Sequence, residues 1–304
     1  MADRKLVIDQ EHPWPWLEAY TADAARFFNG REQDVENLLR CVLSAPATVF
    51  FGKSGLGKTS VIQAGLTSRL KEKQLLPVVV RLDHRIDISL SIQLHSRLIF
   101  SCREQDLLWC GEAVPSSFED STLLWELLHD RKWSISDRQG KRWTPVFLLD
   151  QFEEIFTLQN EPAKRQAVFD ELGDLVEGRV PPSTAARLNT DDDLIDRIDP
   201  DRLGARFVLS LREDYLPDLE TWADRIPRLG PNRYRLLPMT CEQGLAAIDK
   251  TGGELVSTLH AHRIVEFLDQ QGFSSFDPTR PRPNAIKLVE LIDTLDEGVE
   301  RHGL

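Results

Sequence analysis

The sequence has few of the features that mark secreted, membrane-spanning or metal-clustered proteins. Its 304 residues include only 4 Cys, and Cys41, Cys102, Cys110 and Cys241 lack the close paired spacing of a zinc site. Four thiols in a chain of this length also do not indicate a disulfide framework. No window approaches the about 18 uninterrupted apolar residues of a membrane helix, and no apolar segment follows the first basic residues. We therefore expect a cytoplasmic protein with reduced, structural thiols.

Other absences narrow the function. The chain has no internal repeat and no low-complexity tract, which argues against a solenoid or a propeller. Its formal net charge is −12 and its basic residues are scattered, so long-range repulsion opposes contact with nucleic-acid phosphates. The guanine-reading motif N-K-x-D does not occur, which disfavours GTP. These observations predict no direct nucleic-acid partner and no membrane partner, and they argue against a GTP-binding protein.

What the chain does contain is an alternation of strands and helices. Apolar runs rich in β-branched residues predict strands at 47–51, 76–82, 145–149, 205–211 and, more weakly, 234–237. Apolar periodicity predicts helices at 59–71, 89–108, 121–131 and 162–177. The polar segment 180–204 is expected to be a surface insertion. Parallel strands need crossover helices, so we expect an α/β fold with a parallel sheet covered by helices on both faces.

A phosphate-binding loop joins the first predicted strand to the helix after it. The segment fits G-x-x-x-x-G-K-[ST], and its residues are Gly52, Lys53, Ser54, Gly55, Leu56, Gly57, Lys58 and Thr59, with Ser60 following in the helix. Glycines let backbone N–H groups point at phosphates, and the helix N-terminus adds a favourable dipole. We expect Lys58 to neutralise the β- and γ-phosphates and Thr59 to give its hydroxyl to Mg²⁺.

An acidic cluster ends the third predicted strand. Asp150 is followed by Gln151, Phe152, Glu153 and Glu154, which is the layout of a Walker B element. We expect Asp150 to hold the Mg²⁺ shell beside Thr59, and Glu153 or Glu154 to polarise a water, with a slight preference for Glu154. Either glutamate could instead be a solvated or helix-capping residue. One further strand between the two motifs is typical of the ASCE and AAA+ P-loop ATPases, and we place that strand between the motif strands.

The fourth predicted strand ends on Arg212. The carboxyl ends of parallel strands open on the same crevice, so Arg212 can reach the γ-phosphate there and stabilise its charge. A salt bridge to Glu213, Asp214 or a lid carboxylate is the alternative for this arginine. The length exceeds that of a single core, so we divide the chain into a lead-in over 1–29, a P-loop domain over 30–238 and a helical lid over 239–304.

Taken together, these stretches resemble the STAND class of signal-transduction ATPases, near the AAA+ group, and within it the bacterial conflict-associated branch called novel STAND. Residues 27–32 (FFNGRE) are similar to the F-F-x-G-R-E box of that family, after an aromatic and proline-rich lead-in over 13–24. Residues 148–156 (LLDQFEEIF) resemble its D-Q-F-E-E element, and 209–216 (LSLREDYL) its sensor strand. Residues 237–239 (LPM) are similar to its proline motif.

The resemblance implies further contacts and partners. It implies that Gly30 and Arg31 of the box contact adenine and ribose, and that Pro238 contacts the adenine. Family members carry effector and sensor domains that are not visible in this chain, so the sequence is either an excised core or a compact member that acts with separate proteins. ATP, ADP and Mg²⁺ are the implied ligands, and self-association in the ATP state and a role in antiviral defence are the implied biology.

Three functions remain open from the sequence. The leading one is a slowly hydrolysing ATPase switch, in which ADP holds the lid closed and ATP favours an assembling form. A small-molecule phosphotransferase would need a separate acceptor pocket. A DNA loader or translocase of the AAA+ kind would need DNA to stimulate turnover in a salt-sensitive way, and the net charge weighs against it.

Overall fold

The computed structural model describes residues 8–15, 18–84, 88–115, 124–253 and 255–270. Its centre is a parallel sheet with the spatial order β2-β6-β7-β1-β8. The bounds of these strands are Leu75–Val80 for β2, Arg142–Leu149 for β6, Arg206–Arg212 for β7, Ala47–Gly52 for β1 and Arg233–Leu236 for β8. The predicted α/β class with a mostly parallel sheet is confirmed.

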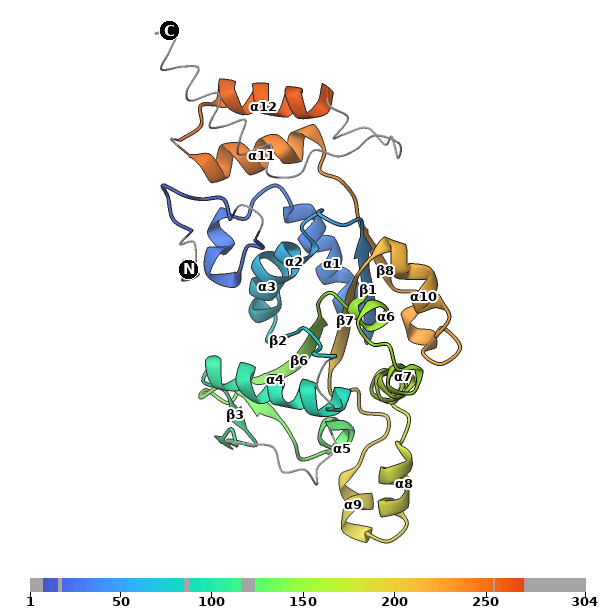
Figure 1. The fold of residues 1–304 in the computed structure, drawn as a ribbon. Helices are drawn as coiled ribbons and strands as arrows, with labels where there is room; N and C mark the ends of the chain where they lie inside the picture. Colours follow the sequence, from blue (N-terminus) through green and yellow to red (C-terminus); the bar gives the residue numbers. More distant parts are fainter. Residues whose placement is uncertain (1–7, 16–17, 85–87, 116–123, 254, 271–304) are drawn as a thin grey trace, which may run out of the picture.

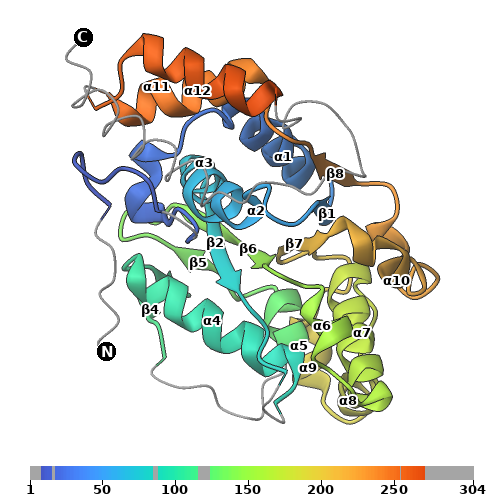
Figure 2. The same ribbon diagram turned by 45° about the horizontal axis from the view of Figure 1, so that its top comes forward.

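Helices cover both faces of this sheet (Figure 2). Alternate residues of β6 belong to two different clusters of buried side chains, because successive side chains of a strand point to opposite faces. Val146 and Leu148 pack with α1 (Glu32–Ser44) and the helix after the phosphate loop. Phe147 and Leu149 lie in the larger cluster, which includes side chains of α4 (Leu90–Glu104), α5 (Leu124–His129) and α7 (Pro162–Glu177). This double burial explains why the strands read as unbroken apolar runs.

The strand between the two motifs was placed wrongly from the sequence. We expected it between the motif strands, but β2 pairs only with β6 among the described strands, and β7 separates β6 from β1. The physical reason lies in Pro77, in the middle of β2. Proline has no N–H to donate to a second neighbour, so it is tolerated at the edge of a sheet and not at its centre.

Short antiparallel strands extend the sheet beyond what the sequence predicted. They are β3 (Leu108–Trp109), β4 (Glu112–Ala113) and β5 (Ile135–Ser136), and β5 pairs with the first residues of β6. Two-residue strands carry too little periodicity to be recognised. They complete an eight-stranded sheet.

The helix after the phosphate loop is not uniform. It runs as α2 (Lys58–Ser60), a π-helical segment η2 (Val61–Leu66) and α3 (Thr67–Glu72). Within the π segment, Gly65 lies against α1, where an added Cβ would overlap the Val35 side chain. The close approach of α1 to this helix therefore requires a residue without a side chain.

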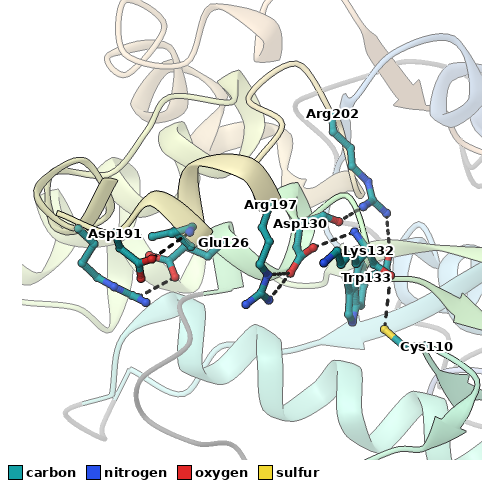
Figure 3. Close-up of polar contacts among 10 residues, drawn as sticks. Cys110, Glu126, Asp130, Lys132, Trp133, Asp191, Arg197 and Arg202 are labelled. Carbon is teal, nitrogen blue, oxygen red and sulfur yellow. Dashed lines mark hydrogen bonds and ion pairs between the residues drawn. The ribbon is translucent and has the colours of Figure 1, made fainter. Parts of the chain in front are cut away.

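The insertion over 180–204 contains two helices, which the sequence did not predict. These are α8 (Pro182–Leu188) and α9 (Asp192–Arg197). Two buried acids hold the insertion, Glu126 of α5 and Asp130 directly after it. Glu126 accepts from Thr184 at 2.9 Å and Arg187 at 2.7 Å, and Asp130 accepts from Arg197 Nε at 3.0 Å (Figure 3). The insertion is therefore fixed to the body of the protein by ion pairs.

Two helices form a layer above the P-loop domain (Figure 1). They are α11 (Cys241–Gly252) and α12 (Thr258–Gln270), and they pack together through Ile248, Val256, Ala261 and Ile264. The rest of the predicted lid, residues 271–304, lies outside the described residues. No helix within the described ranges is long and apolar enough to cross a membrane.

The helix α11 is seated on the segment that precedes α1. Thr251 donates to the Phe27 carbonyl at 2.9 Å and accepts from Asn29 at 3.1 Å, and Lys250 pairs with Glu32 at 3.2 Å. Trp14 of the lead-in packs with the same apolar cluster as α11 and α12. Residues 27–32 therefore form part of the surface against which α11 packs.

Candidate nucleotide-binding site

The phosphate loop follows β1 directly and depends on three glycines. An added Cβ at Gly52 would lie 2.7 Å from the Leu236 carbonyl of β8, so a side chain there would separate the two strands. Gly55 and Gly57 have φ angles of +79° and +84°, in the left-handed region that other residues rarely adopt. The loop geometry predicted from the motif therefore has a physical cause at each glycine.

The ammonium of Lys58 is folded back into the loop. Its Nζ donates to the carbonyls of Gly52 at 2.9 Å and Lys53 at 3.1 Å. Burial lowers the pKa of Lys58, and the nearby carboxylates of Glu153 and Asp150 act in the opposite direction. The amine thus lies between the phosphate loop and the acidic end of β6, held by backbone oxygens that a bound phosphate can replace.

Asp150 ends β6 below the loop and is buried. Burial raises the pKa of its carboxyl group, and the hydroxyls of Thr59 and Ser210 lie beside it. Ser60, which follows Thr59, accepts a hydrogen bond on its hydroxyl from the backbone N–H of Tyr20 at 3.1 Å. Of the two hydroxyls predicted for nucleotide or metal, that of Thr59 therefore faces the acid, and that of Ser60 holds the lead-in.

The two glutamates of the acidic element point to different places. Glu153 is close enough to Lys58, Asp150 and Arg212 for their charges to act on it, and burial raises the pKa of its carboxyl group. Its Oε2 is buried without a hydrogen-bond partner. Glu154 instead forms an ion pair with Arg81 at the end of β2. These contacts make Glu153 the better candidate for the base, whereas the motif alone slightly favours Glu154.

A strained backbone turn separates these acids. Gln151 has a φ angle of +54°, which is uncommon for a residue with a side chain. On either side of it, the N–H of Asp150 donates to Val80 at 2.8 Å and that of Phe152 to Ser210 at 2.8 Å. The end of β6 is therefore bonded to both neighbouring strands while the chain turns Glu153 toward the loop. The sequence carries no signal for this conformation.

Arg212 ends β7 at the same edge of the sheet. Its Nη2 donates to Asp214 at 2.6 Å, and its guanidinium lies 5.6 Å from the centre of the Tyr215 ring. The alternative salt bridge is thus present, and the Nε of Arg212 is buried without a partner. The charges of Lys58 and Glu153 act on this arginine, which places it beside the acidic element.

The box residues contact the protein itself. Gly30 has a φ angle of +84°, and an added Cβ would overlap the Gln243 carbonyl of α11. Arg31 is buried, pairs with Asp34 at 3.0 Å and donates to the carbonyls of Leu56 and Leu237. Pro238, the third residue assigned by resemblance to the nucleoside, is exposed just after β8. Nucleoside contacts by these residues remain predictions.

Oxygen donors at the loop fit a magnesium ion. Thr59 and Asp150 offer a hydroxyl and a carboxylate, which are the hard ligands that Mg²⁺ prefers. Ser210 Oγ and Glu153 Oε2 are buried beside them without hydrogen-bond partners. Among the residues that the structure describes, no group of three His, Cys, Asp or Glu side chains could hold a metal by itself. The donor set therefore fits a metal that a nucleotide also ligates.

The fold and this loop define a P-loop NTPase. The model of the family "Novel STAND NTPase 1" matches residues 13–273. The chain belongs to this novel STAND NTPase family, as the motifs predicted. None of the curated proteins compared with the sequence matches it.

Solved structures share the fold at low sequence identity. An ORC2 protein of Aeropyrum pernix, solved in ADPNP–ADP complexes, is 13% identical with a TM-score of 0.51, covering 90% of this chain and 63% of its own. The Walker-type ATPase paby2304 of Pyrococcus abyssi is also 13% identical with a TM-score of 0.51, covering 94% of this chain and 77% of its own. The chain thus spans less than two thirds of the ORC2 protein.

Proposed function

We propose that the protein is an ATP-binding, slowly ATP-hydrolysing switch whose lid responds to the nucleotide. One observation carries the proposal: the acids and cations of the site surround the phosphate loop, while the lid helix α11 is bonded to the segment that also contacts that loop. The choice of ATP rests on the missing N-K-x-D motif, and the ADP complexes of the Aeropyrum ORC2 protein are consistent with an adenine nucleotide.

The residues of the loop would divide the chemistry among them. Lys58 would leave its two carbonyl acceptors and neutralise the β- and γ-phosphates, and the loop N–H groups would bind phosphate oxygens. Thr59 and Asp150 would hold Mg²⁺, which supplies charge neutralisation on the phosphates when bound. Glu153 would accept a proton from the attacking water, helped by a pKa that burial raises. Arg212 would exchange Asp214 for the γ-phosphate.

The same geometry supports a slow enzyme. Lys58 and Arg212 both have acceptors in this structure, and each has to exchange them before it can bind phosphate. A switch needs long-lived nucleotide states and not rapid turnover. We propose that the ATP form assembles with copies of itself, acts with effector and sensor parts outside this chain, and serves antiviral defence.

The test is ATP turnover per chain as the protein concentration rises, with Lys58→Ala as the blank. Self-assembly predicts that the specific rate rises with concentration and that sedimentation shows larger species with a nonhydrolysable ATP analogue than with ADP. A flat rate with one sedimenting species in every nucleotide would reject the assembling switch. Stoichiometric phosphorylation of an added metabolite, or turnover stimulated by DNA, would instead favour the phosphotransferase or the DNA loader.

The biological role has its own test. Deleting the complete gene in its host should increase sensitivity to at least one phage in a broad panel, and the Lys58→Ala gene should fail to restore resistance. Unchanged sensitivity across the panel would reject antiviral defence while leaving the ATPase intact.

A further inference from the structure

The arginine of the box occupies a position that local rules disfavour. Arg31 is the N-cap residue of α1, where Ser, Thr, Asp or Asn normally satisfies free N–H groups, and it makes no such cap. Its positive charge lies at the positive end of the helix dipole and is buried to 3% exposure. Burying a charge is costly unless it is paired. The contacts of Arg31 should therefore show what compensates for these costs.

Those contacts join three parts of the protein. One nitrogen, Nη1, donates to Asp34 Oδ2 at 3.0 Å and to the Leu237 carbonyl at 2.9 Å, and Nη2 donates to the Leu56 carbonyl at 3.2 Å. Leu56 belongs to the phosphate loop, and Leu237 lies in the connection between β8 and the lid. A planar guanidinium can hold these acceptors in one fixed arrangement, which an ammonium cannot do.

The carboxylate that pairs with Arg31 extends the connection. Asp34 also accepts from the Tyr234 hydroxyl of β8 at 2.6 Å and from the side-chain amide of Gln243 in α11 at 3.4 Å. The neighbouring Gly30 allows α11 to lie against the box, because any side chain there would overlap the Gln243 backbone. The phosphate loop, the lid connection and the lid helix therefore meet at the ion pair of the buried Arg31 with the partly buried Asp34.

We infer that Arg31 is a positioning residue that couples occupancy of the phosphate loop to the position of the lid, through the carbonyls of Leu56 and Leu237. A nucleotide that reorients the Leu56 peptide removes one of the acceptors of the guanidinium, and the buried arginine has to rearrange with the lid connection. The inference rests on the proposed nucleotide switch and names the side chain that transmits it. Arg31 then acts through the protein and not through a side-chain contact with the base.

An arginine of β7, Arg206, provides a matched control. Arg206 donates to the carbonyls of Val42 at 2.9 Å and Ala45 at 2.8 Å, at the opposite end of α1. Burial lowers its pKa, so it too is partly withdrawn from water. Arg206 likewise joins helix and sheet through two backbone oxygens, but it contacts neither the phosphate loop nor the lid.

The experiment compares Arg31→Lys and Arg206→Lys in the full chain. Hydrogen exchange of the α11 amides is measured with ADP, with a nonhydrolysable ATP analogue and without nucleotide, and a fluorescent ADP gives the Kd. Wild type and Arg206→Lys should show a nucleotide-dependent change in exchange of about fivefold or more. In Arg31→Lys that change should fall to less than about twofold at saturating nucleotide.

The outcomes separate this inference from the switch itself. A wild-type lid that ignores nucleotide rejects the switch. A responsive wild type with an equally responsive Arg31→Lys protein overturns the role of Arg31, and so does a variant that only weakens Kd while the lid responds fully at saturation. If Arg31→Lys does not fold, the Arg31→Met/Asp34→Asn double variant removes both buried charges and is read by the same criteria.

Discussion

Two buried acidic regions of the molecule solve the same electrostatic problem differently. Glu126 of α5 and Asp130 directly after it each accept from an arginine of the insertion, Arg187 and Arg197. Just after β6, Asp150 has two hydroxyls and the N–H of Gln151 as neighbours, and Lys58, whose charge acts on it, donates to backbone carbonyls. In the first region the acids form ion pairs that hold the insertion in place. In the second region Asp150 forms no ion pair with a neighbouring cation among the described residues.

This difference indicates which of the two regions binds a ligand. A buried acid with a full set of partners contributes to structure, and a buried acid without them raises the free energy of the empty protein until a ligand arrives. Beside the phosphate loop, Glu153, Ser210 and Arg212 each bury a polar atom without a hydrogen-bond partner. The following predictions are ordered from the largest expected effect to the smallest.

Removing the loop cation should abolish function at the incompletely paired site. We expect Lys58→Ala to lower ATP turnover by at least about a hundredfold, because one preorganised donor at a developing charge is worth about that much. Steady-state phosphate release measures it. Lys141→Ala is the control and should keep the wild-type rate, because Lys141 is exposed and lies just before the first residue of β6. A Lys58→Ala protein with half the wild-type rate would contradict the site.

The same substitution should have very different effects on hydrolysis at the two adjacent glutamates. Glu153→Gln should lower single-turnover hydrolysis by about a hundredfold while Kd stays unchanged, because it removes a general base and keeps the shape. Glu154→Gln only loosens a pair with the largely exposed Arg81 and should change the rate by less than about threefold. The opposite ranking would return the base to Glu154.

Stability should respond in opposite directions in the two regions. Asp130→Asn should lower the free energy of unfolding by about 1–2 kcal/mol, because the Arg197 pair and its hydrogen bonds are weakened. Asp150→Asn should leave it unchanged or raise it by up to about 1 kcal/mol, since it neutralises a buried acid without a cation partner, and should abolish Mg²⁺-dependent turnover. Urea unfolding without nucleotide measures both. A destabilised Asp150→Asn protein would remove the contrast.

The smallest effect is a pH dependence. Burial raises the pKa of Asp150 and Glu153 in the folded protein above their ordinary values. Between the ordinary and the raised pKa, the folded state binds more protons than the unfolded state, so stability falls as pH rises through that window. Relative to wild type, the Asp150→Asn/Glu153→Gln protein should therefore gain stability as the pH rises above the ordinary carboxyl pKa of about 4. Parallel pH curves of the two proteins would contradict the raised pKa values.

The class and the phosphate loop were predictable because their signals are local. Gly52, Lys58 and Thr59 lie within one short strand–loop–helix segment, and β-branched apolar runs predict buried strands without knowledge of their partners. The prediction for 162–177 matches the bounds of α7, where Pro162 begins the helix and Gly178 ends it in the left-handed conformation.

What the sequence did not predict depends on partners far away in the chain. Arg81 determines the position of Glu154, and Leu56 and Leu237 determine the contacts of Arg31. No periodicity contains that information. The strand order also depends on nonlocal pairing, although Pro77 in β2 was a local signal for an edge strand. The short helices α8 and α9 form ion pairs with Glu126 of α5 and with Asp130 directly after it, which the sequence pattern of the insertion does not predict.

The pairing of β1 sets the time at which the site can exist. Ala47 pairs with Phe207 and Gly52 with Leu236, so the strand that carries the phosphate loop has partners made only about 160 to 185 residues later. At roughly 5–20 residues per second, a ribosome needs on the order of ten seconds or more to supply them. Until β8 has been synthesised, the growing chain contains the whole phosphate-loop motif, but β1 lacks the neighbouring strands that hold it in the sheet. Nucleotide can therefore stabilise this protein only after most of the P-loop domain has been synthesised.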